Sequence, residues 1–353
     1  MLKKVIIVGG IPSPIGGVTS YIYRLLLAFP NNYFSLIDLY PHRSKVYLDS
    51  SLNIKHEIFN GIRLSFIIYL FRKVDYVIHF NFSTFGAVPF FLLMPKRNLQ
   101  KWILILHNGD PIKNLDRSCF YFIYKKIFEC ALKKFDRIVY LNDKQYKVYI
   151  SFGVDEKKLI SMDSFVPLSE NEDLSVPISI DDLFIDVDFG SSIIMNGYCK
   201  SFYNFHHGVE YVLERNHSVL IIALYGDEDE AYKSELMDLI GKSDRVKIVE
   251  NLDQNKFNNL MAQADIYLRA NSIDSFGIAV ADAVCLGIKV VASDVCKRFD
   301  GAILYNVNDR NELFGVLDDI YLLDVSKINI SFNKANYLND LAIKYSLLYE
   351  FDD

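Results

Sequence analysis

Cysteine is scarce in this sequence, and its spacing excludes two ways of stabilising a fold. The 353 residues contain five cysteines, an odd number, and no two of them form a C-x-x-C pair. This spacing argues against a disulfide framework and against a zinc knuckle. We therefore expect a protein of a reducing compartment. The cysteines are Cys119, Cys130, Cys199, Cys285 and Cys296.

A membrane-spanning run and a targeting segment are also missing. The apolar stretch from Ser83 to Met94 contains Pro89 and is shorter than the roughly 20 residues that a membrane span needs. The apolar part of the opening MLKKVIIVGG is too short for a signal peptide and leads into a glycine loop. We expect a cytoplasmic protein whose first residues form a β-strand.

Low-complexity sequence is absent, and acidic residues are few in the first half. Apolar residues make up 51% of the chain, enough for two globular domains of roughly 150 to 180 residues. Residues 1–160 contain 23 Lys and Arg against 11 Asp and Glu, whereas the rest contains 15 against 33. The basic half is expected to contact an anionic surface, with a solvated surface of mixed sign as the alternative. No motif that reads nucleic acid occurs, so no nucleic-acid partner is expected.

Short apolar runs alternate with segments of helical period along most of the chain. This alternation predicts an α/β protein built from parallel βαβ units. An acidic stretch with two prolines interrupts the alternation after Val166, as a linker would. We predict Rossmann-like, doubly wound domains over 1–166 and 191–330, a linker over 167–190, and a closing helix over 331–353 that packs back on the first domain. Ligands of such folds bind at the carboxyl ends of the strands, so a cleft between the two domains is expected to hold the site.

The stretch NSIDSFGIAVADAVCLG, from Asn271 to Gly287, reads as a loop leaving a strand and the helix after it. Asp274 then lies at the carboxyl edge of the sheet. The backbone N–H groups of Phe276, Gly277 and Ile278 fall at the helix start, where an anion such as a diphosphate is favoured.

Asp282 follows further along the same helix, where its carboxylate could accept hydrogen bonds from ribose hydroxyls. The alternative is that Asp274 or Ser275 caps the helix and Asp282 faces water. The spacing alone does not decide between the two interpretations.

The segment DSFGIAVADAVCLGIKVVASD resembles the signature of retaining glycosyltransferases of the GT-B fold, a family-4-like group of bacterial enzymes that build surface polysaccharides. The matching positions are Asp274, Phe276 to Gly277, Asp282 to Ala283, Gly287 and Val290 to Ser293. Both acidic positions are usually glutamate in that family, and both are aspartate here. The resemblance implies two Rossmann-like domains that face each other across a cleft.

Other positions match in the order expected for that family. Gly16 and Gly17 resemble the glycine pair beside the donor diphosphate, with an ordinary βα turn as the alternative. His107 resembles a histidine that contacts the donor sugar, with a satisfied core histidine as the alternative. Gly197 resembles the loop glycine after the first strand of the second domain. Many relatives follow that glycine with an arginine and later a Lys-Gly pair, and here Lys200 is the nearby cation, with a surface lysine as the alternative.

The resemblance implies sugar transfer, with retention, from a UDP- or GDP-linked donor to a saccharide acceptor, without a cofactor or metal. It implies that Asp274 orients the sugar, Asp282 holds the ribose, residues 275–278 hold the diphosphate, and His107 contacts the sugar. The implied acceptor is lipid-linked, at the inner face of a bacterial membrane, as in O-antigen or capsule synthesis. Asp186 and Asp188 form a D-x-D, but in a predicted linker we expect no metal there.

Arg117 to Phe135 groups Lys126, Lys133 and Lys134 on one helical face with aromatic residues around it, a pattern that can rest on anionic lipid. The alternative is a helix packed on its sheet with lysines in solvent. Two other functions stay open, a non-catalytic GT-B relative acting as scaffold or partner, and a nucleotide-sugar epimerase.

Overall fold

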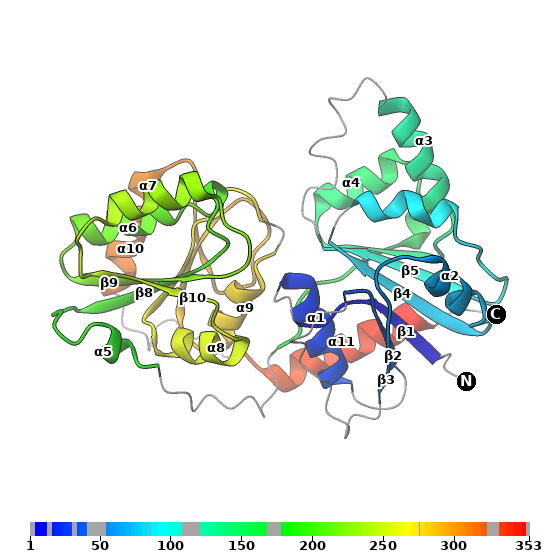
Figure 1. The fold of residues 1–353 in the computed structure, drawn as a ribbon, viewed down its shortest axis with the longest axis horizontal. Coiled ribbons are helices and arrows are strands. Elements are labelled where there is room, and N and C mark those ends of the chain that lie inside the picture. The colour runs from blue at the N-terminus through cyan, green and yellow to red at the C-terminus, as the bar shows by residue number, and fades with distance from the viewer. Residues whose placement is uncertain are drawn as a thin grey trace. The chain divides into compact units, whose positions relative to one another are not determined.

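The computed structural model divides into two compact units (Figure 1). The N-terminal unit comprises Met1–Val166 and Ala335–Asp353, and the C-terminal unit comprises Pro167–Lys334. The residues described are 4–12, 16–29, 34–40, 54–83, 85–107, 121–167, 178–274, 276–322 and 332–350.

A seven-stranded parallel sheet, in the order β3-β2-β1-β4-β5-β6-β7, forms the centre of the N-terminal unit. Its strands are β1 (Lys4–Gly9), β2 (Phe34–Asp38), β3 (Lys55–Ile58), β4 (Tyr76–Phe82), β5 (Lys101–Leu106), β6 (Arg137–Tyr140) and β7 (Leu159–Ser161). The strand order reverses between β1 and β4, which makes the carboxyl ends of these strands a topological switch point.

Alternate residues of β4 point to opposite faces of this sheet, as the two-residue period of a strand requires. Phe80 packs in one core with residues of α2 (Leu64–Phe71), of the 3-10 helix η2 (Phe85–Leu92), of α3 (Tyr121–Leu132) and of α4 (Asp143–Ser151). His79 points to the other face, where its Nδ1 lies 2.9 Å from the hydroxyl of Tyr349 on α11 (Lys334–Tyr349). Helix α1 (Gly17–Ala28) packs against α11, since the hydroxyls of Tyr21 and Tyr345 are hydrogen-bonded.

A six-stranded parallel sheet, in the order β10-β9-β8-β11-β12-β13, forms the centre of the C-terminal unit. Its strands are β8 (Ser191–Gly197), β9 (Ser218–Leu224), β10 (Val246–Glu250), β11 (Ile266–Arg269), β12 (Lys289–Ser293) and β13 (Ile303–Tyr305). Because β8 lies between β9 and β11, the order reverses at β8, and its carboxyl end beside β11 is the second switch point.

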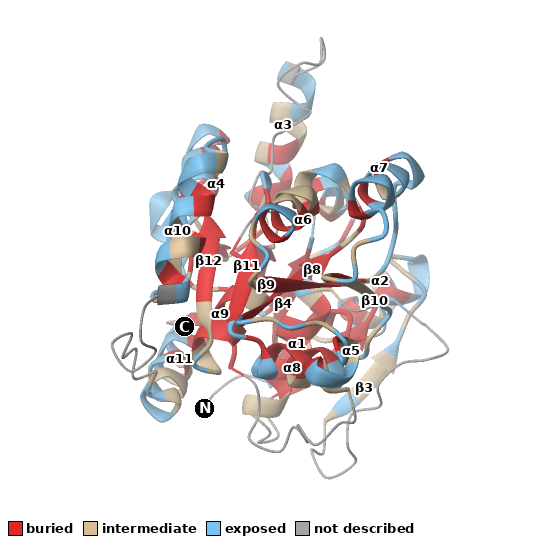
Figure 2. Ribbon diagram, turned by 90° about the vertical axis from the view of Figure 1, so that its left-hand side faces the viewer, coloured by how far each residue is buried: buried red, intermediate tan, exposed pale blue. Residues whose placement is uncertain are grey.

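Helices cover both faces of the second sheet. Residues of α6 (Phe205–Glu214), α7 (Glu230–Ile240) and α10 (Arg310–Leu322) share one core, and those of α5 (Ile180–Leu183), α8 (Gln254–Gln263) and α9 (Ile278–Cys285) share the other. Figure 2 shows β8, β9, β11 and β12 largely buried, while the outer sides of α6, α7 and α10 are exposed. The architecture is that of two doubly wound α/β domains, as the sequence predicts.

Part of the segment predicted as a linker, 167–190, packs on the C-terminal unit. Ile180 and Phe184 are buried in the core that also holds Phe257 and Met261 of α8. In the described part of the chain, no helix is long and apolar enough to cross a bilayer.

Candidate functional site

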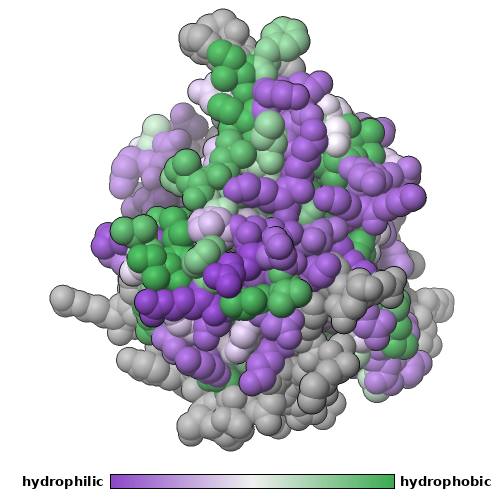
Figure 3. Space-filling view, turned by 90° about the vertical axis from the view of Figure 1, so that its right-hand side faces the viewer, coloured by the Kyte–Doolittle hydropathy of each residue, from purple (hydrophilic) through white to green (hydrophobic). Residues whose placement is uncertain are grey.

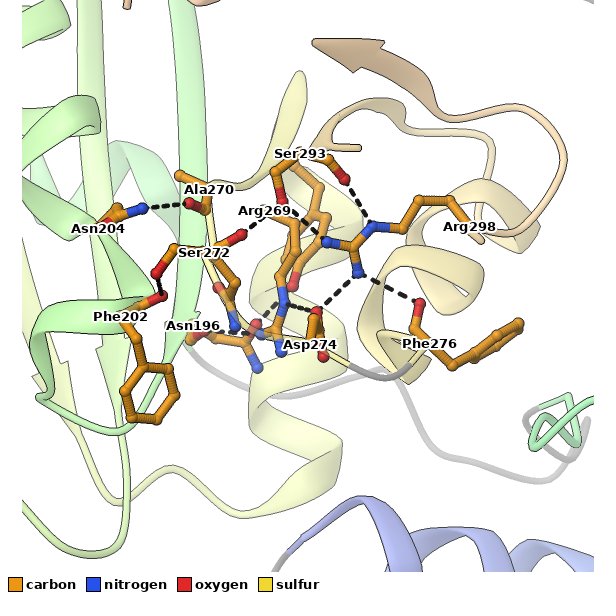
Figure 4. A network of polar contacts seen from close by, with 12 residues as sticks. Asn196, Phe202, Asn204, Arg269, Ala270, Ser272, Asp274, Phe276, Ser293 and Arg298 are labelled. Carbon is orange, nitrogen blue, oxygen red and sulfur yellow. Dashed lines mark hydrogen bonds and ion pairs between the residues drawn. The ribbon is translucent and has the colours of Figure 1, made fainter. Parts of the chain in front are cut away.

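Two arginines hold the carboxylate of Asp274 at the switch point of the C-terminal unit (Figure 4). Oδ2 of Asp274 accepts a hydrogen bond from Nε of Arg269 at 2.9 Å and another from Nη1 of Arg298 at 2.7 Å. Arg269 is the last residue of β11, and Arg298 lies in the loop between β12 and β13. The carboxylate thus joins two separate segments of this sheet edge.

Further hydrogen bonds fix both guanidinium groups. Arg269 donates from Nη1 to the carbonyl of Asn196, at the end of β8, at 3.2 Å. Arg298 donates to the carbonyl and the hydroxyl of Ser293, each at 3.0 Å, and to the carbonyl of Phe276 at 3.3 Å. The two cations are therefore rigidly placed before any ligand binds.

Electrostatics keep Asp274 ionised. Burial opposes its charge, but attraction to Arg269 and Arg298 and their hydrogen bonds outweigh burial and hold the pKa of this carboxyl well below its usual range. Because one carboxylate faces two guanidinium groups, this cluster carries one net positive charge at neutral pH. A cluster of this sign suits an anionic ligand.

Gly277 fits closely beneath this ion pair. Its φ is +80°, a left-handed conformation that side chains disfavour, and a Cβ atom would lie 2.8 Å from Nη1 of Arg298. Helix α9 begins at Ile278, with Gly277 at its N-cap and without a side-chain cap. The N-cap position thus belongs to Gly277, and Oδ2 of Asp274 binds the two arginines. Ser275 lies outside the described residues.

Asp282 lies within α9 and is 2% exposed. The alternative in which it faces water is therefore wrong, because the residue is almost entirely buried. The helix then stops near Gly287, whose φ of +77° is the left-handed conformation common just after the end of a helix.

The loop after β8 holds the other residues predicted in this unit. A Cβ atom on Gly197 would collide with the ring of Tyr203, so the loop needs glycine there. Lys200 lines an open pocket of about 620 Å³ at the ends of β8, β9 and β10. Its other lining residues are Cys199, Leu224, Tyr225, Gly226, Asp227, Glu228, Glu250 and Asn251.

Tyr198 follows Gly197, where the resemblance leads us to expect an arginine. Its ring packs 5.0 Å from the ring of Tyr225, and it closes over Gly226, where a Cβ atom would collide with it. The side chain is a packing residue and supplies no cation. Arg269 comes from the neighbouring strand and reaches the same end of β8.

His107 follows β5, the strand beside β4, next to the switch point of the N-terminal unit. Its ring lies 4.8 Å from the ring of Tyr21, and Nε2 lies 3.3 Å from Oδ1 of Asn81. Nδ2 of Asn81 donates to the carbonyl of His79, so Oδ1 accepts the N–H of His107. Burial lowers the pKa of His107 to about 3, and the neutral ring therefore keeps its Nδ1 lone pair as an acceptor.

Gly16 and Gly17 form the start of α1, the helix that carries Tyr21. The carbonyl of Gly16 accepts hydrogen bonds from the hydroxyl of Thr19 at 3.0 Å and from the N–H of Ser20 at 2.9 Å. Helix α1 thus places Tyr21, whose ring lies against His107, one turn after the glycine pair.

The lysines after and within α3 are engaged inside the N-terminal unit. Lys126 and Lys133 both pair with Glu129, at 2.9 and 2.7 Å. Lys134 donates to three main-chain carbonyls at the end of η2, those of Phe91, Leu92 and Met94. Lys134 is therefore turned toward η2. Contact of this segment with lipid stays a prediction, and residues 117–120 of it lie outside the described residues.

Arg269 and Arg298 are the two site residues that sequence reasoning missed. One signal was present, since Arg269 ends the otherwise uncharged strand IYLR, and a charge in a buried strand needs a partner. Arg298 gave no comparable signal. Among the described residues, no group of three or more His, Cys, Asp and Glu side chains could hold a metal ion.

Residues 205–304 match the family model described as "Glycosyl transferases group 1". This region contains β9 to β12, Asp274 and α9. Among curated proteins, no match was found.

Solved structures share the fold of nearly the whole chain. Anabaena HepE in complex with UDP and glucose is 13% identical, with 98% of this chain and 99% of that chain covered and a TM-score of 0.71. The OtsA apo structure is 11% identical over 99% and 100%, with a TM-score of 0.72. Sucrose-phosphate synthase from Thermosynechococcus elongatus is 15% identical over 98% and 99%, with a TM-score of 0.69.

The chain has the GT-B fold, and its fold together with the matched family region supports a glycosyltransferase.

Proposed function

We propose that this protein transfers a sugar, with retention and without a metal, from a nucleotide-diphosphate sugar to a saccharide acceptor. The observation that carries the proposal is the ion cluster of Asp274, Arg269 and Arg298 at the start of α9. It combines a fixed carboxylate, two fixed cations and the first amides of a helix. Such a combination suits a sugar bound through a diphosphate.

Arg269 and Arg298 take the place of the two cations that the sequence lacks. Their net charge with Asp274 is positive, and they are held by main-chain carbonyls, so they are preorganised for the charge that develops on the departing diphosphate. The amides of residues 276–278 add donors at the same helix start. That Ser275, outside the described residues, joins them in holding the diphosphate is part of the same proposal. Lys200, on the rim of the pocket beside β8, supplies a further cation.

Asp274 then orients the sugar hydroxyls, and Asp282 binds the ribose. UDP is the preferred nucleotide, because HepE, which has the same fold, was solved with UDP and glucose. GDP remains the alternative that the experiment below resolves.

The N-terminal unit supplies the acceptor side. His107, neutral and with one nitrogen engaged by Asn81, contacts the sugar through its other nitrogen, and Gly16 and Gly17 approach the diphosphate. The acceptor is a lipid-linked saccharide of bacterial surface-polysaccharide synthesis, such as O-antigen or capsule. The enzyme then works in the cytoplasm, at the inner face of the membrane.

The decisive experiment incubates the protein with a panel of UDP- and GDP-sugars and measures release of the nucleoside diphosphate. One donor should be hydrolysed slowly without acceptor, and the same nucleotide should raise the melting temperature. A ligand at 100 times its Kd adds about 2.7 kcal/mol to the stability of the folded state. If no nucleoside diphosphate stabilises the protein and none is released, it is a scaffold, and the proposal fails.

Product analysis separates transfer from epimerisation. A transferase gives a new glycosidic bond of the same anomeric configuration as the donor, whereas an epimerase gives a changed sugar without a bond to an acceptor. Finding an inverted linkage would overturn retention while leaving transfer intact.

A further inference from the structure

The outward side of α2 carries apolar side chains that the core of the unit does not use. Leu64, Ile68 and Phe71 follow one another at intervals of four and three residues, which places them on one side of the helix. They are 71%, 44% and 38% exposed. Phe66 and Leu70, on the other side, are buried in the core. This short helix is therefore apolar on both sides.

The neighbouring segment adds to the same apolar surface. Helix η2 lies over the same face of the sheet as α2, and it exposes Phe90 and Leu92 while burying Phe91; Leu93, just after it, is also exposed. Figure 3 looks onto this side of the unit and shows apolar side chains gathered in groups between polar ones. The members of this surface, called the α2–η2 surface below, are Leu64, Ile68, Phe71, Phe90, Leu92, Leu93 and Leu99.

Specific contacts join the two parts. The side-chain amide of Gln100 donates to the carbonyl of Leu70 at 2.7 Å and to that of Lys73 at 2.6 Å. The guanidinium of Arg97 lies 4.8 Å from the centre of the Phe71 ring. The end of α2 and the loop after η2 therefore form one surface.

Cations border this surface, and acids are nearly absent from it. Residues 58–109 contain six Lys and Arg but only one acidic residue, Asp75. Arg63 and Arg72 flank the two ends of α2, and both are exposed, as is Arg97. Among the described residues, no ion pair engages these three arginines, in contrast to the lysines at α3.

We propose that the α2–η2 surface enters the head-group region of an anionic lipid bilayer, with Arg63, Arg72 and Arg97 at the level of the phosphates. Apolar side chains bordered by arginines have the composition of an interfacial membrane contact. A second copy of the chain fits poorly, because a twofold contact would bring arginines of both copies together. The inference rests on the proposed function in one respect: a lipid-linked acceptor would explain why the enzyme binds a membrane.

A single introduced tryptophan tests this contact. The natural sequence has one tryptophan, Trp102, which is buried and gives a constant background. Leu93→Trp places a reporter on the surface, and Ile185→Trp is the matched control in the C-terminal unit, since the two positions are 79% and 77% exposed. The tryptophan emission of each variant is recorded during titration with phosphatidylglycerol vesicles and, separately, with phosphatidylcholine vesicles. It is also recorded without lipid.

The emission of Leu93→Trp should move to shorter wavelength with phosphatidylglycerol vesicles, and that of Ile185→Trp should not. Adding Arg63→Gln or Arg72→Gln should weaken vesicle binding about fivefold each, as expected for roughly 1 kcal/mol per charge. The proposal fails if neither tryptophan responds to phosphatidylglycerol vesicles, if both respond equally, or if phosphatidylcholine vesicles shift the emission as strongly. It also fails if the emission of Leu93→Trp shifts without lipid as the protein concentration rises, which would indicate self-association.

Nucleoside diphosphate release without acceptor requires no vesicles. If release is observed while vesicles have no effect, only the lipid contact is refuted. If vesicles bind but no nucleotide acts, only the enzymatic proposal is refuted.

Discussion

Nη1 of Arg298 lies 2.7 Å from Oδ2 of Asp274, in an ion pair whose arginine side chain is 1% exposed. Removing one partner of a buried pair leaves a charge without full compensation. Arg298→Met should therefore lower the free energy of unfolding by about 3 kcal/mol, measured by urea unfolding. Arg310→Met is the control, because its pair with Glu210 is more exposed, and it should cost less than about 1 kcal/mol. Equal losses in the two variants would show that the buried pair contributes no more to the free energy of unfolding than the exposed pair.

Binding and turnover should respond in opposite ways to charge changes in this cluster. Asp274→Asn removes a negative charge from beside the proposed diphosphate, so UDP should bind at least as tightly, while donor turnover falls about 100-fold. Arg269→Gln should weaken UDP binding about tenfold, the loss of a charged hydrogen bond. Calorimetry and nucleotide release measure the two effects. If both variants weaken UDP binding alike, Asp274 has a purely structural role.

Asn81 should set the tautomer of His107. Asn81→Leu removes the acceptor of the Nε2 proton, so turnover should fall about tenfold while UDP affinity stays unchanged. Asn81→Asp keeps an acceptor but adds a charge that favours the imidazolium form. The acidic limb of the pH profile of turnover should therefore lie at higher pH in the Asn81→Asp variant than in the natural protein. An unchanged pH profile would contradict this role.

His79 should make the protein sensitive to acid. Burial, and then repulsion from His107, lower the pKa of His79 to about 3, below the ordinary value of 6.5. The unfolded chain therefore takes up the proton first, and stability is complete above about pH 6.5 and declines as the pH falls toward 3. Between pH 7 and 5 this group should cost about 2 kcal/mol. Measured by urea unfolding, the His79→Asn variant should lose about 2 kcal/mol less stability between pH 7 and 5 than the natural protein. An equal loss in the variant and the natural protein would refute the prediction.

Local sequence patterns predicted the fold and part of the candidate site. The strand, the loop with Asp274, the helix after Gly277 and its stop at Gly287 follow from short-range signals, namely periodicity, helix-start donors and glycine conformation. The two doubly wound sheets follow from the alternation of strands and helices.

Long-range pairing could not be foretold in the same way. Arg298 reaches Asp274 across 24 residues, and no period or local preference relates the two positions. The lysines near α3 illustrate the same limit, because helical spacing groups them, whereas Glu129 and the carbonyls of η2 determine what they bind. In both cases the partner is chosen by tertiary packing.

The ring of Tyr203 fills the space where a side chain at position 197 would lie, and it also lies 5.3 Å beneath the guanidinium of Arg269. The positions 197, 203 and 269 are thus coupled in space, and we expect them to be coupled in evolution. A homologue that carries alanine at 197 must reduce the ring at 203, and it then loses the platform that holds the arginine at 269. These three positions should vary together among the descendants of a common ancestor, and a sequence that changes one alone should be rare.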